Sequence, residues 1–277
     1  LLGKKEHLIN VMENGNFEFK VFDLFDLERL DNLFQKEKFD TVFHLAANSD
    51  IKAGVKSTSR DLNLTFMITF NVLECMRKNN VQDILFTSSP TIFGSHDVAL
   101  SENLTMKPES LYGASKLASE AFIRAFSALY GIKAWILRLS NMVGERTTHG
   151  ILFDFLKKID EDEKYLTVLG DGNQCKPYMY VKELIDCMLF VIENSTKKIN
   201  EYNVGPKDGV KVSEIAEIFL KYCGADQSIK YTGGKTGWKG DVPFYAHDAS
   251  KLRDLGWEPK LSSRNAIELA IKSIKQE

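Results

Sequence analysis

Residues 41–47 read Thr41-Val42-Phe43-His44-Leu45-Ala46-Ala47, a nearly continuous apolar run that decides the fold. Such a run is typical of a parallel strand that is covered on both faces. Two later runs, Asp83–Thr87 and Ala134–Leu139, predict further strands. Helical spacing separates them, first over 62–76 and then over Leu111–Tyr130, which Gly131 ends. This alternation predicts an α/β fold, a Rossmann-like doubly wound parallel sheet.

The flanking sequence extends this pattern in both directions. The alternating segment Phe17–Phe22 predicts a strand, and a short helix is expected over Leu27–Lys36. After Gly144 the pattern is less regular, with helices predicted over Val181–Asn194, Val212–Cys223 and Ser263–Lys275. We therefore expect a dinucleotide-binding domain over 1–144 and a smaller α/β substrate lobe over 145–277, interleaved with the first.

Composition restricts the class of protein. The 277 residues are 44% hydrophobic and carry a net charge of 36 − 38 = −2, with no cluster typical of nucleic-acid or membrane-surface binding. No apolar run is long enough to span a membrane. The four cysteines are scattered without a CxxC pair, which indicates neither a zinc site nor a disulfide framework and favours the cytoplasm: Cys75, Cys175, Cys187 and Cys223. We expect no metal site.

The sharpest chemical signal is Tyr112-Gly113-Ala114-Ser115-Lys116. Residues i and i+4 share one face of a helix, so the Tyr112 phenol and the Lys116 ammonium project together. A lysine cation beside a tyrosine lowers the pKa of the phenol, which makes Tyr112 a candidate general base. Taken alone, such a pair is more often an ordinary surface feature of a helix.

A hydroxyl-rich turn favours the interpretation of Tyr112 and Lys116 as a catalytic pair. Ser88 and Ser89 stand at the carboxyl end of a predicted central strand, where doubly wound sheets bind their ligands. A Ser89 hydroxyl there is able to share a hydrogen bond with the substrate oxygen that Tyr112 deprotonates. The alternative is a turn whose serines only satisfy backbone groups.

With these motifs in place, the chain resembles the extended short-chain dehydrogenases/reductases of the nucleotide-sugar epimerase/dehydratase family. The matching pieces run in family order over nearly the whole chain: His44-Leu45-Ala46-Ala47, Ser88 to Gly94, Leu111 to Leu117, Arg138-Leu139-Ser140-Asn141 and Leu169 to Gln174. The resemblance implies an enzyme that uses NAD and acts on a nucleotide-diphospho-sugar.

The resemblance also implies roles for individual residues. Those for the cofactor are Asp23 and Leu24 at the adenine, Leu45, Ala46 and Ala47 along the dinucleotide, Leu139 beside the nicotinamide, and Tyr112 with Lys116 at the nicotinamide ribose; Ser88 is a further cofactor-binding residue. Those for the substrate are Ser89, helped by Thr91, at the sugar hydroxyl, Asn141 and Lys176 at the diphosphate, and Asp241 at the nucleoside ribose. Ser89, Thr91, Tyr112 and Lys116 form the implied catalytic set.

Two departures from the family pattern stand out. The glycine-rich GxxGxxG loop that binds the pyrophosphate is absent, and the sequence opens without methionine. We expect the first strand, this loop and the first helix, roughly 35–40 residues, to precede Leu1. Lys176 also stands where many relatives place an arginine, and a lysine cannot form the bidentate fork with phosphate.

The turn residues discriminate between reactions. Family dehydratases carry an acid pair after the hydroxyl residue, whereas this chain has Pro90 and Thr91. Ser89-Pro90-Thr91 is closest to the Ser-Ala-Thr of the UDP-galactose 4-epimerases. We therefore expect a 4-epimerase. A dehydratase, a net reductase and a non-catalytic dinucleotide-binding scaffold stay open. Relatives pair the helices near 62–79 and 111–130 into a homodimer, which the spacing here permits.

Overall fold

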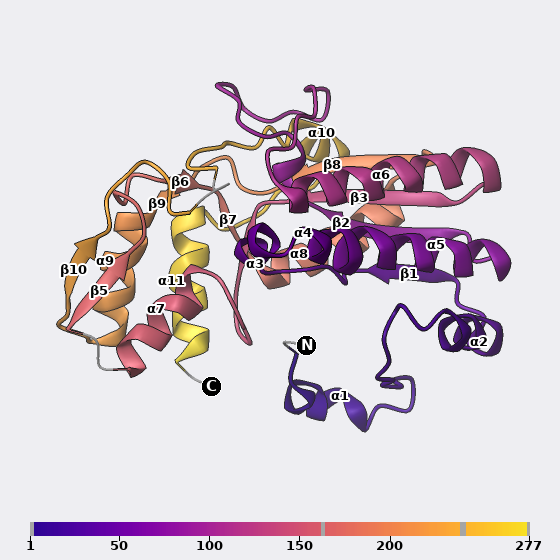
Figure 1. The fold of residues 1–277 in the computed structure, drawn as a ribbon, viewed down its shortest axis with the longest axis horizontal. Helices are drawn as coiled ribbons and strands as arrows, with labels where there is room; N and C mark the ends of the chain where they lie inside the picture. Colours follow the sequence, from indigo (N-terminus) through magenta and orange to yellow (C-terminus); the bar gives the residue numbers. More distant parts are fainter. Residues whose placement is uncertain (1–2, 162–163, 239–241, 276–277) are drawn as a thin grey trace.

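The computed structural model describes residues 3–161, 164–238 and 242–275, and its largest element is a four-stranded parallel sheet (Figure 1). The strands lie in the order β1-β2-β3-β8. They comprise β1 (Thr41–His44), β2 (Asp83–Ser88), β3 (Lys133–Leu139) and β8 (Ile199–Val204). The register pairs Thr41 with Asp83, Asp83 with Lys133 and Ala134 with Ile199. All four carboxyl ends therefore meet at one edge, which confirms the predicted α/β class.

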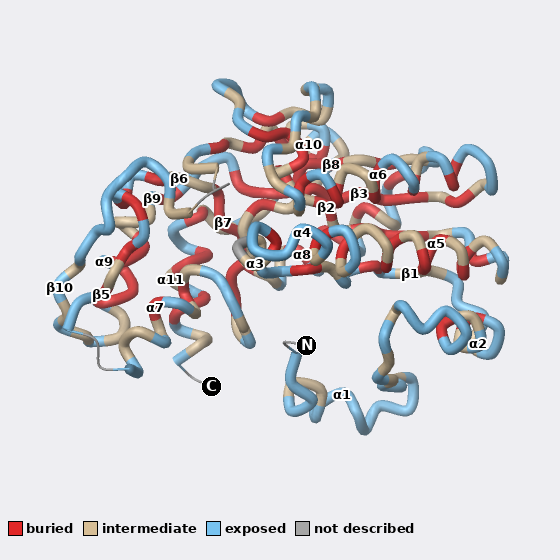
Figure 2. The backbone as a smooth tube through the Cα atoms, in the orientation of Figure 1, coloured by how far each residue is buried: buried red, intermediate tan, exposed pale blue. Residues whose placement is uncertain are grey.

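Helices cover both faces of this sheet. On one face α2 (Leu27–Glu37), α5 (Ile68–Lys78) and α6 (Leu111–Tyr130) pack on alternate strand residues such as Phe86 and Ile136. On the other, α8 (Val181–Asn194) and α10 (Ser250–Leu255) pack on Leu85 and Trp135. Figure 2 shows the buried residues gathered in β2, β3, β8 and the inner faces of these helices. The alternation explains the apolar strands, since both of their faces are covered.

A smaller lobe follows in the second half of the chain. Its strand pairs are β5 (Tyr165–Val168) with β10 (Ser228–Tyr231), β4 (Asn141–Val143) with β7 (Tyr178–Tyr180), and β6 (Cys175–Lys176) with β9 (Val210–Lys211). The helices α7 (Ile151–Asp160), α9 (Val212–Cys223) and α11 (Ser263–Ile274) pack around its own apolar cluster. Because β8 and α8 return to the large sheet, the second half contributes to both lobes. The division at residue 144 stays a prediction.

The remaining elements all precede α6 in the chain. They are η1 (Lys5–Leu8), α1 (Ile9–Met12), α3 (Ile51–Lys56), α4 (Thr58–Asp61), the π-helical turn η2 (Leu62–Met67) and the 3₁₀ turn η3 (Pro90–Ile92). Since α4, η2 and α5 follow one another directly, the helix predicted from residue 62 begins earlier, at Thr58.

The strand predicted over Phe17–Phe22 is wrong. This segment belongs to no strand, and Val21 is 71% exposed. Among the described residues no strand pairs with it, and Lys20 is held instead by ion pairs with Glu18 and Glu37, each 2.8 Å long. An alternating pattern gives a strand only where a neighbouring strand satisfies its backbone. The run 41–47 is likewise shorter than predicted, because the strand ends at His44 and 45–47 form a loop.

Candidate active site

The turn after β2 places two hydroxyl groups side by side. Ser89 caps η3, and its Oγ accepts hydrogen bonds from the Thr91 backbone N–H at 3.3 Å and the Thr91 hydroxyl at 2.9 Å. Because Thr91 donates to the Ser89 oxygen, the Ser89 hydroxyl keeps its own proton for another acceptor. That acceptor is Tyr112, and this hydrogen bond favours the phenolate form of Tyr112.

The first turn of α6 packs directly on this hydroxyl turn. Ser110 caps the helix by accepting from the Gly113 N–H at 3.0 Å, and Tyr112 is its second residue. A Cβ atom on Gly113 would lie 2.5 Å from the carbonyl oxygen of Thr91. Glycine therefore permits the close approach that brings Tyr112 to Ser89. This requirement was not recognised in the sequence, although Gly113 directly follows Tyr112.

Lys116 lies one turn further along the same face, as predicted by the spacing. Its side chain is 2% exposed, and its Nζ donates to the Thr87 carbonyl at 2.6 Å. The Nζ atom lies 4.6 Å from the centre of the Phe86 ring and 5.8 Å from that of Tyr112. The structure thus brings Ser89, Thr91, Tyr112 and Lys116 together at the carboxyl end of β2.

The pKa values differ from the sequence-based expectation for Tyr112. Burial, and then the charge of Asp61, raise the pKa of Tyr112 to about 12, although Lys116 was expected to lower it. The same burial lowers the pKa of Lys116 to about 7, opposed by the charge of Glu120. Desolvation penalises whichever form is charged, so it moves an acid and a base in opposite directions.

A buried ion pair fixes α6 to the sheet below. The Arg138 guanidinium in β3 donates to both Glu120 carboxylate oxygens, at 3.0 and 2.8 Å, and both side chains are fully buried. Glu120 lies four residues after Lys116. The bidentate geometry therefore holds the helix face that carries the candidate base.

The residues expected at the cofactor surround the same sheet edge. Leu45, Ala46 and Ala47 form the loop after β1, where Leu45 is 54% exposed, and Leu139 ends β3. Ser88 ends β2 and is buried; its Oγ has no hydrogen-bond partner among the described residues. Asp23 accepts from the Phe25 N–H at 3.0 Å, and α5 fixes this turn through Asn71, which donates to the Leu24 carbonyl at 2.9 Å.

The two described residues expected at the substrate diphosphate lie in separate strands of the smaller lobe. Asn141 begins β4, and its Nδ2 donates to the Pro177 carbonyl at 3.3 Å and to the Tyr245 hydroxyl at 3.2 Å. Lys176 lies in β6, with its Nζ 5.2 Å from the centre of the Trp238 ring. Asp241 falls outside the described residues. Tyr245 had no signal in the sequence because its contact with Asn141 spans 104 positions.

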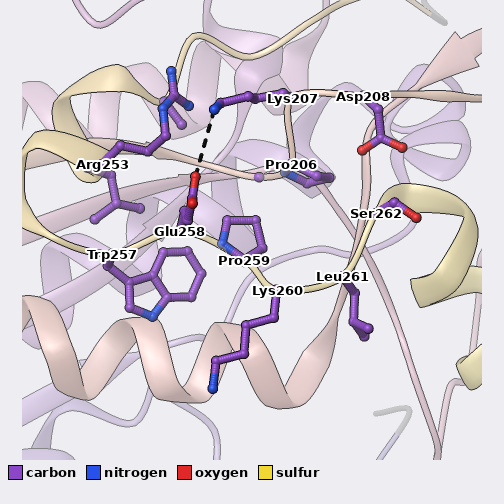
Figure 3. Close-up of a pocket in the computed structure, with 13 residues that line it drawn as sticks. Pro206, Lys207, Asp208, Arg253, Trp257, Glu258, Pro259, Lys260, Leu261 and Ser262 are labelled. Carbon is purple, nitrogen blue, oxygen red and sulfur yellow. Dashed lines mark ion pairs between the residues drawn. The ribbon is translucent and has the colours of Figure 1, made fainter.

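Of two cavities in the structure, one is lined in part by a predicted site residue and the other is not. One of about 20 Å³ lies beside Thr91 and is lined by Pro90, Thr91, Gly94, Leu100, Val242 and Tyr245. A larger one of about 190 Å³ lies between the segment after β8 and the segment joining α10 to α11 (Figure 3). Several of its charged groups are engaged with the protein: Lys207 faces Glu258 at 3.8 Å, and Asp208 accepts from the Ser263 N–H. No predicted site residue lines it, so we place the candidate site at the edge of the sheet.

Comparison with known proteins identifies the family. Residues 2–205 match the model described as "NAD dependent epimerase/dehydratase family". The chain belongs to this family. A putative UDP-glucose 4-epimerase from Methanocaldococcus jannaschii is 28% identical, over 95% of this chain and 85% of the relative.

Solved structures agree with this assignment. A UDP-galactose 4-epimerase is 30% identical with a TM-score of 0.84, over 95% of this chain and 85% of that one. The UDP-glucuronic acid 4-epimerase of Bacillus cereus, in complex with UDP-glucuronic acid and NAD, is 25% identical with a TM-score of 0.86, over 98% and 85%. The protein is therefore an enzyme of nucleotide-sugar metabolism, and its cofactor is NAD.

The residues present fit NAD at two ends of the dinucleotide. Leu45, exposed in the loop after β1, and Leu139, at the end of β3, offer apolar side chains at the sheet edge where Lys116 also lies, which suits a nicotinamide and its ribose. Asp23, at the turn held by α5, offers a carboxylate to an adenine amino group. Across the described residues there is no cluster of His, Cys, Asp and Glu that would hold a metal ion, and no helix long and apolar enough to cross a membrane.

Proposed function

We propose that the protein is an NAD-dependent 4-epimerase of nucleotide-diphospho-sugars, with UDP-glucose and UDP-galactose as its substrates. The observation that carries this proposal is the turn Ser89-Pro90-Thr91 packed on Tyr112. Thr91 uses its hydroxyl to orient Ser89, and neither Pro90 nor Thr91 has a carboxyl group with which to eliminate water. A single base and a hydrogen-bonding serine suffice for epimerisation.

The chain's own residues perform the proton transfer. The Tyr112 phenolate, to which Ser89 donates, takes the proton from the sugar 4-hydroxyl as the C–H bond at the same carbon breaks. NAD supplies the reversible acceptance of one hydride. Once the 4-keto sugar has turned its other face, Tyr112 returns the proton to the oxygen at C4. Lys116 would hold the cofactor ribose and, in its protonated form, adds positive charge beside Tyr112.

The substrate's diphosphate would lie toward the smaller lobe. As implied by their family positions, we assign Lys176 to the diphosphate and Asp241 to the nucleoside ribose, whereas the orientation of Asn141 leads us to propose the sugar as its partner. The contacts of Asn141 support an oriented side chain: because a carbonyl only accepts, its Nδ2 faces Pro177 and its Oδ1 faces away. That orientation suits a sugar hydroxyl as the partner of Asn141 better than a phosphate oxygen.

Proton NMR of UDP-glucose incubated with the protein and NAD⁺ tests the activity. We expect the anomeric signal of UDP-galactose to grow with no net NADH, and the Tyr112→Phe variant to slow this growth by a factor of about 10²–10⁴. A 4-keto-6-deoxy product would show a dehydratase instead. Net NADH would show a dehydrogenase, and an unchanged rate in Tyr112→Phe would remove Tyr112 from the mechanism.

We further propose a homodimer formed through η2, α5 and α6. The apolar groups Leu62, Phe122 and Leu129 are 49%, 39% and 71% exposed, and Phe66 packs edge-on against Phe122 at 4.9 Å between centroids. An exposed apolar surface of this kind favours association. Light scattering coupled to size exclusion should give twice the mass of one chain for the wild type. The Phe122→Glu variant should give the mass of a single chain. A wild-type monomer would refute the dimer.

We also propose that the enzyme works in the reducing cytoplasm. Cys75 and Cys187 are buried free thiols, and Cys175 and Cys223 are half-buried free thiols.

A further inference from the structure

A buried carboxylate lies next to the candidate active site and takes no part in the chemistry described above. Asp61 is 1% exposed and ends α4 at the residue where the π-helical turn η2 begins. Turns of this type occur frequently at functional sites. A carboxylate so far from water is costly unless other groups compensate for its charge. Its position therefore needs an explanation.

Two segments, the loop after β1 and α3, hold the Asp61 carboxylate in place. Asn48, in the loop after β1, donates from Nδ2 to Asp61 Oδ1 at 2.7 Å. The backbone N–H of Asn48 donates to the buried Thr65 hydroxyl of η2 at 3.2 Å, so the loop and the π turn are joined. From α3, Gly54 approaches so closely that a Cβ there would lie 1.9 Å from Asp61 Oδ2. Only a residue without a side chain leaves room for this carboxylate.

The carboxylate acts on Tyr112. Both α4 and η2 pack against α6, which begins one residue before Tyr112 (Figure 1). After burial, the negative charge of Asp61 is the largest influence that raises the pKa of Tyr112, and it opposes the hydrogen bond from Ser89. The charged groups that act on Asp61 are Arg60, which lowers its pKa, and Asp50, which raises it; burial raises it most. Lys116 is the cation on the α6 face of Tyr112.

We propose that Asp61 is a positioning residue for proton transfer: held by Asn48 and Gly54 against α6, its carboxylate keeps Tyr112 protonated between successive hydride transfers. This inference rests on the proposed function of Tyr112. An epimerase base must take the proton from the sugar and hold it while the 4-keto sugar turns, so a strongly stabilised phenolate would be too weak a base for the first half of the reaction. Ser89 stabilises the phenolate and Asp61 destabilises it, and the balance between them suits transfer in both directions.

The ionisation of Tyr112 tests this proposal without substrate or turnover. The protein is labelled with ¹³C at the tyrosine ring carbon that bears the hydroxyl, and the Tyr112 resonance is assigned by its loss in Tyr112→Phe. In Asp61→Asn the amide oxygen still accepts from Asn48 while the charge is gone. We expect Tyr112 in this variant to reach a given degree of ionisation at a pH lower by about 0.5–1 unit than in the wild type.

Matched variants distinguish the effect of the Asp61 charge on Tyr112 from an effect of the substitution on folding. Asp50→Asn removes an exposed carboxylate from the same loop, and asparagine still caps α3, so Tyr112 should ionise as in the wild type. Asp61→Ser replaces Asp61→Asn if circular dichroism shows the latter unfolded. Equal ionisation of Tyr112 in the wild type and in a folded, uncharged Asp61 variant would overturn the proposal, whatever the enzyme's activity. A shift in Asp50→Asn as large as that in Asp61→Asn would overturn it too.

Discussion

Lys116 is needed for the proposed chemistry but lowers the free energy of unfolding. Its ammonium is 2% exposed, and its hydrogen-bond partner is the neutral Thr87 carbonyl. Burial lowers its pKa from 10.5 to about 7. Replacing a buried charge by an apolar side chain of similar volume is often stabilising, by about 1–4 kcal/mol. We therefore predict that Lys116→Met unfolds less readily than the wild type while its activity is lost.

The pH dependence checks this prediction. Between pH 7 and 10.5 the unfolded wild type binds a proton on Lys116 that the folded state lacks, so its stability rises with pH across this window. Lys116→Met lacks that rise, and its advantage should be largest at or below pH 7. Urea unfolding at pH 6 and at pH 9.5 measures it. Lys36→Met, at a side chain that is 72% exposed, should change stability by only about 0.5 kcal/mol or less. A loss of stability in Lys116→Met at pH 6 would refute the prediction.

At the scale of elements, the joint between α6 and β3 decides where Tyr112 lies. Glu120 and Arg138 pair with no exposed surface, and Arg124 and Glu201 lie 3.5 and 3.8 Å from them, respectively, as further ion-pair partners. Removing Glu120 leaves the buried Arg138 with Glu201, at 3.8 Å, as its remaining ion-pair partner among the described residues, so we predict that Glu120→Ala loses about 3 kcal/mol of unfolding free energy. Replacing both, in Glu120→Leu with Arg138→Met, should recover most of that loss. For comparison, Arg264→Ala, at a 52% exposed ion pair, should lose about 1 kcal/mol or less. Denaturant titrations of all variants compare these losses.

The elements also show which parts of the fold can be predicted from sequence. The bounds of α6, α8 and α9 agree with the predictions, because long amphipathic segments with a stop signal such as Gly131, at φ 77°, are locally encoded. The strands of the smaller lobe were missed, since two to four residues carry no measurable period. The wrong strand at 17–22 shows the converse, that a strand pattern without a neighbouring strand stays an extended loop.

At the scale of the whole molecule, two buried histidines make the fold sensitive to acid. His44, paired with the Thr69 hydroxyl at 2.9 Å, has a pKa lowered by burial to about 3, and burial lowers that of His247 to about 4. From pH 6.5 down to about 4 the unfolded chain binds protons on both that the folded chain does not. Stability is therefore lost as the pH falls through this range, by up to about 1.4 kcal/mol per pH unit for each histidine.

Thermal unfolding between pH 7 and pH 4.5 measures this loss. His247→Gln should flatten the dependence of the melting temperature on pH, and the exposed His149→Gln should leave it as in the wild type. An equally steep dependence in His247→Gln would contradict the assignment to His247.

In the candidate site, as in the fold, the residues that could be predicted are those whose positions depend on local sequence. Ser89, Tyr112 and Lys116 were recognised because the spacing within one helix, and the end of one strand, determine where they lie. Asp61, Tyr245 and the Glu120–Arg138 pair were not, since their roles come from contacts between segments far apart in the sequence. The pKa of Tyr112 is raised, where a lower one was expected, because burial and the charge of Asp61 become evident only in three dimensions.

The most direct test of the central claim follows the hydrogen at C4 of the sugar. UDP-glucose that carries deuterium at C4 is incubated with the protein and NAD⁺, and the products are examined by NMR and mass spectrometry. We predict UDP-galactose that retains its deuterium at C4, because the hydride returns to the carbon it left. Deuterium found at C6 of a 4-keto-6-deoxy sugar, or lost into free reduced cofactor, would contradict the 4-epimerase account.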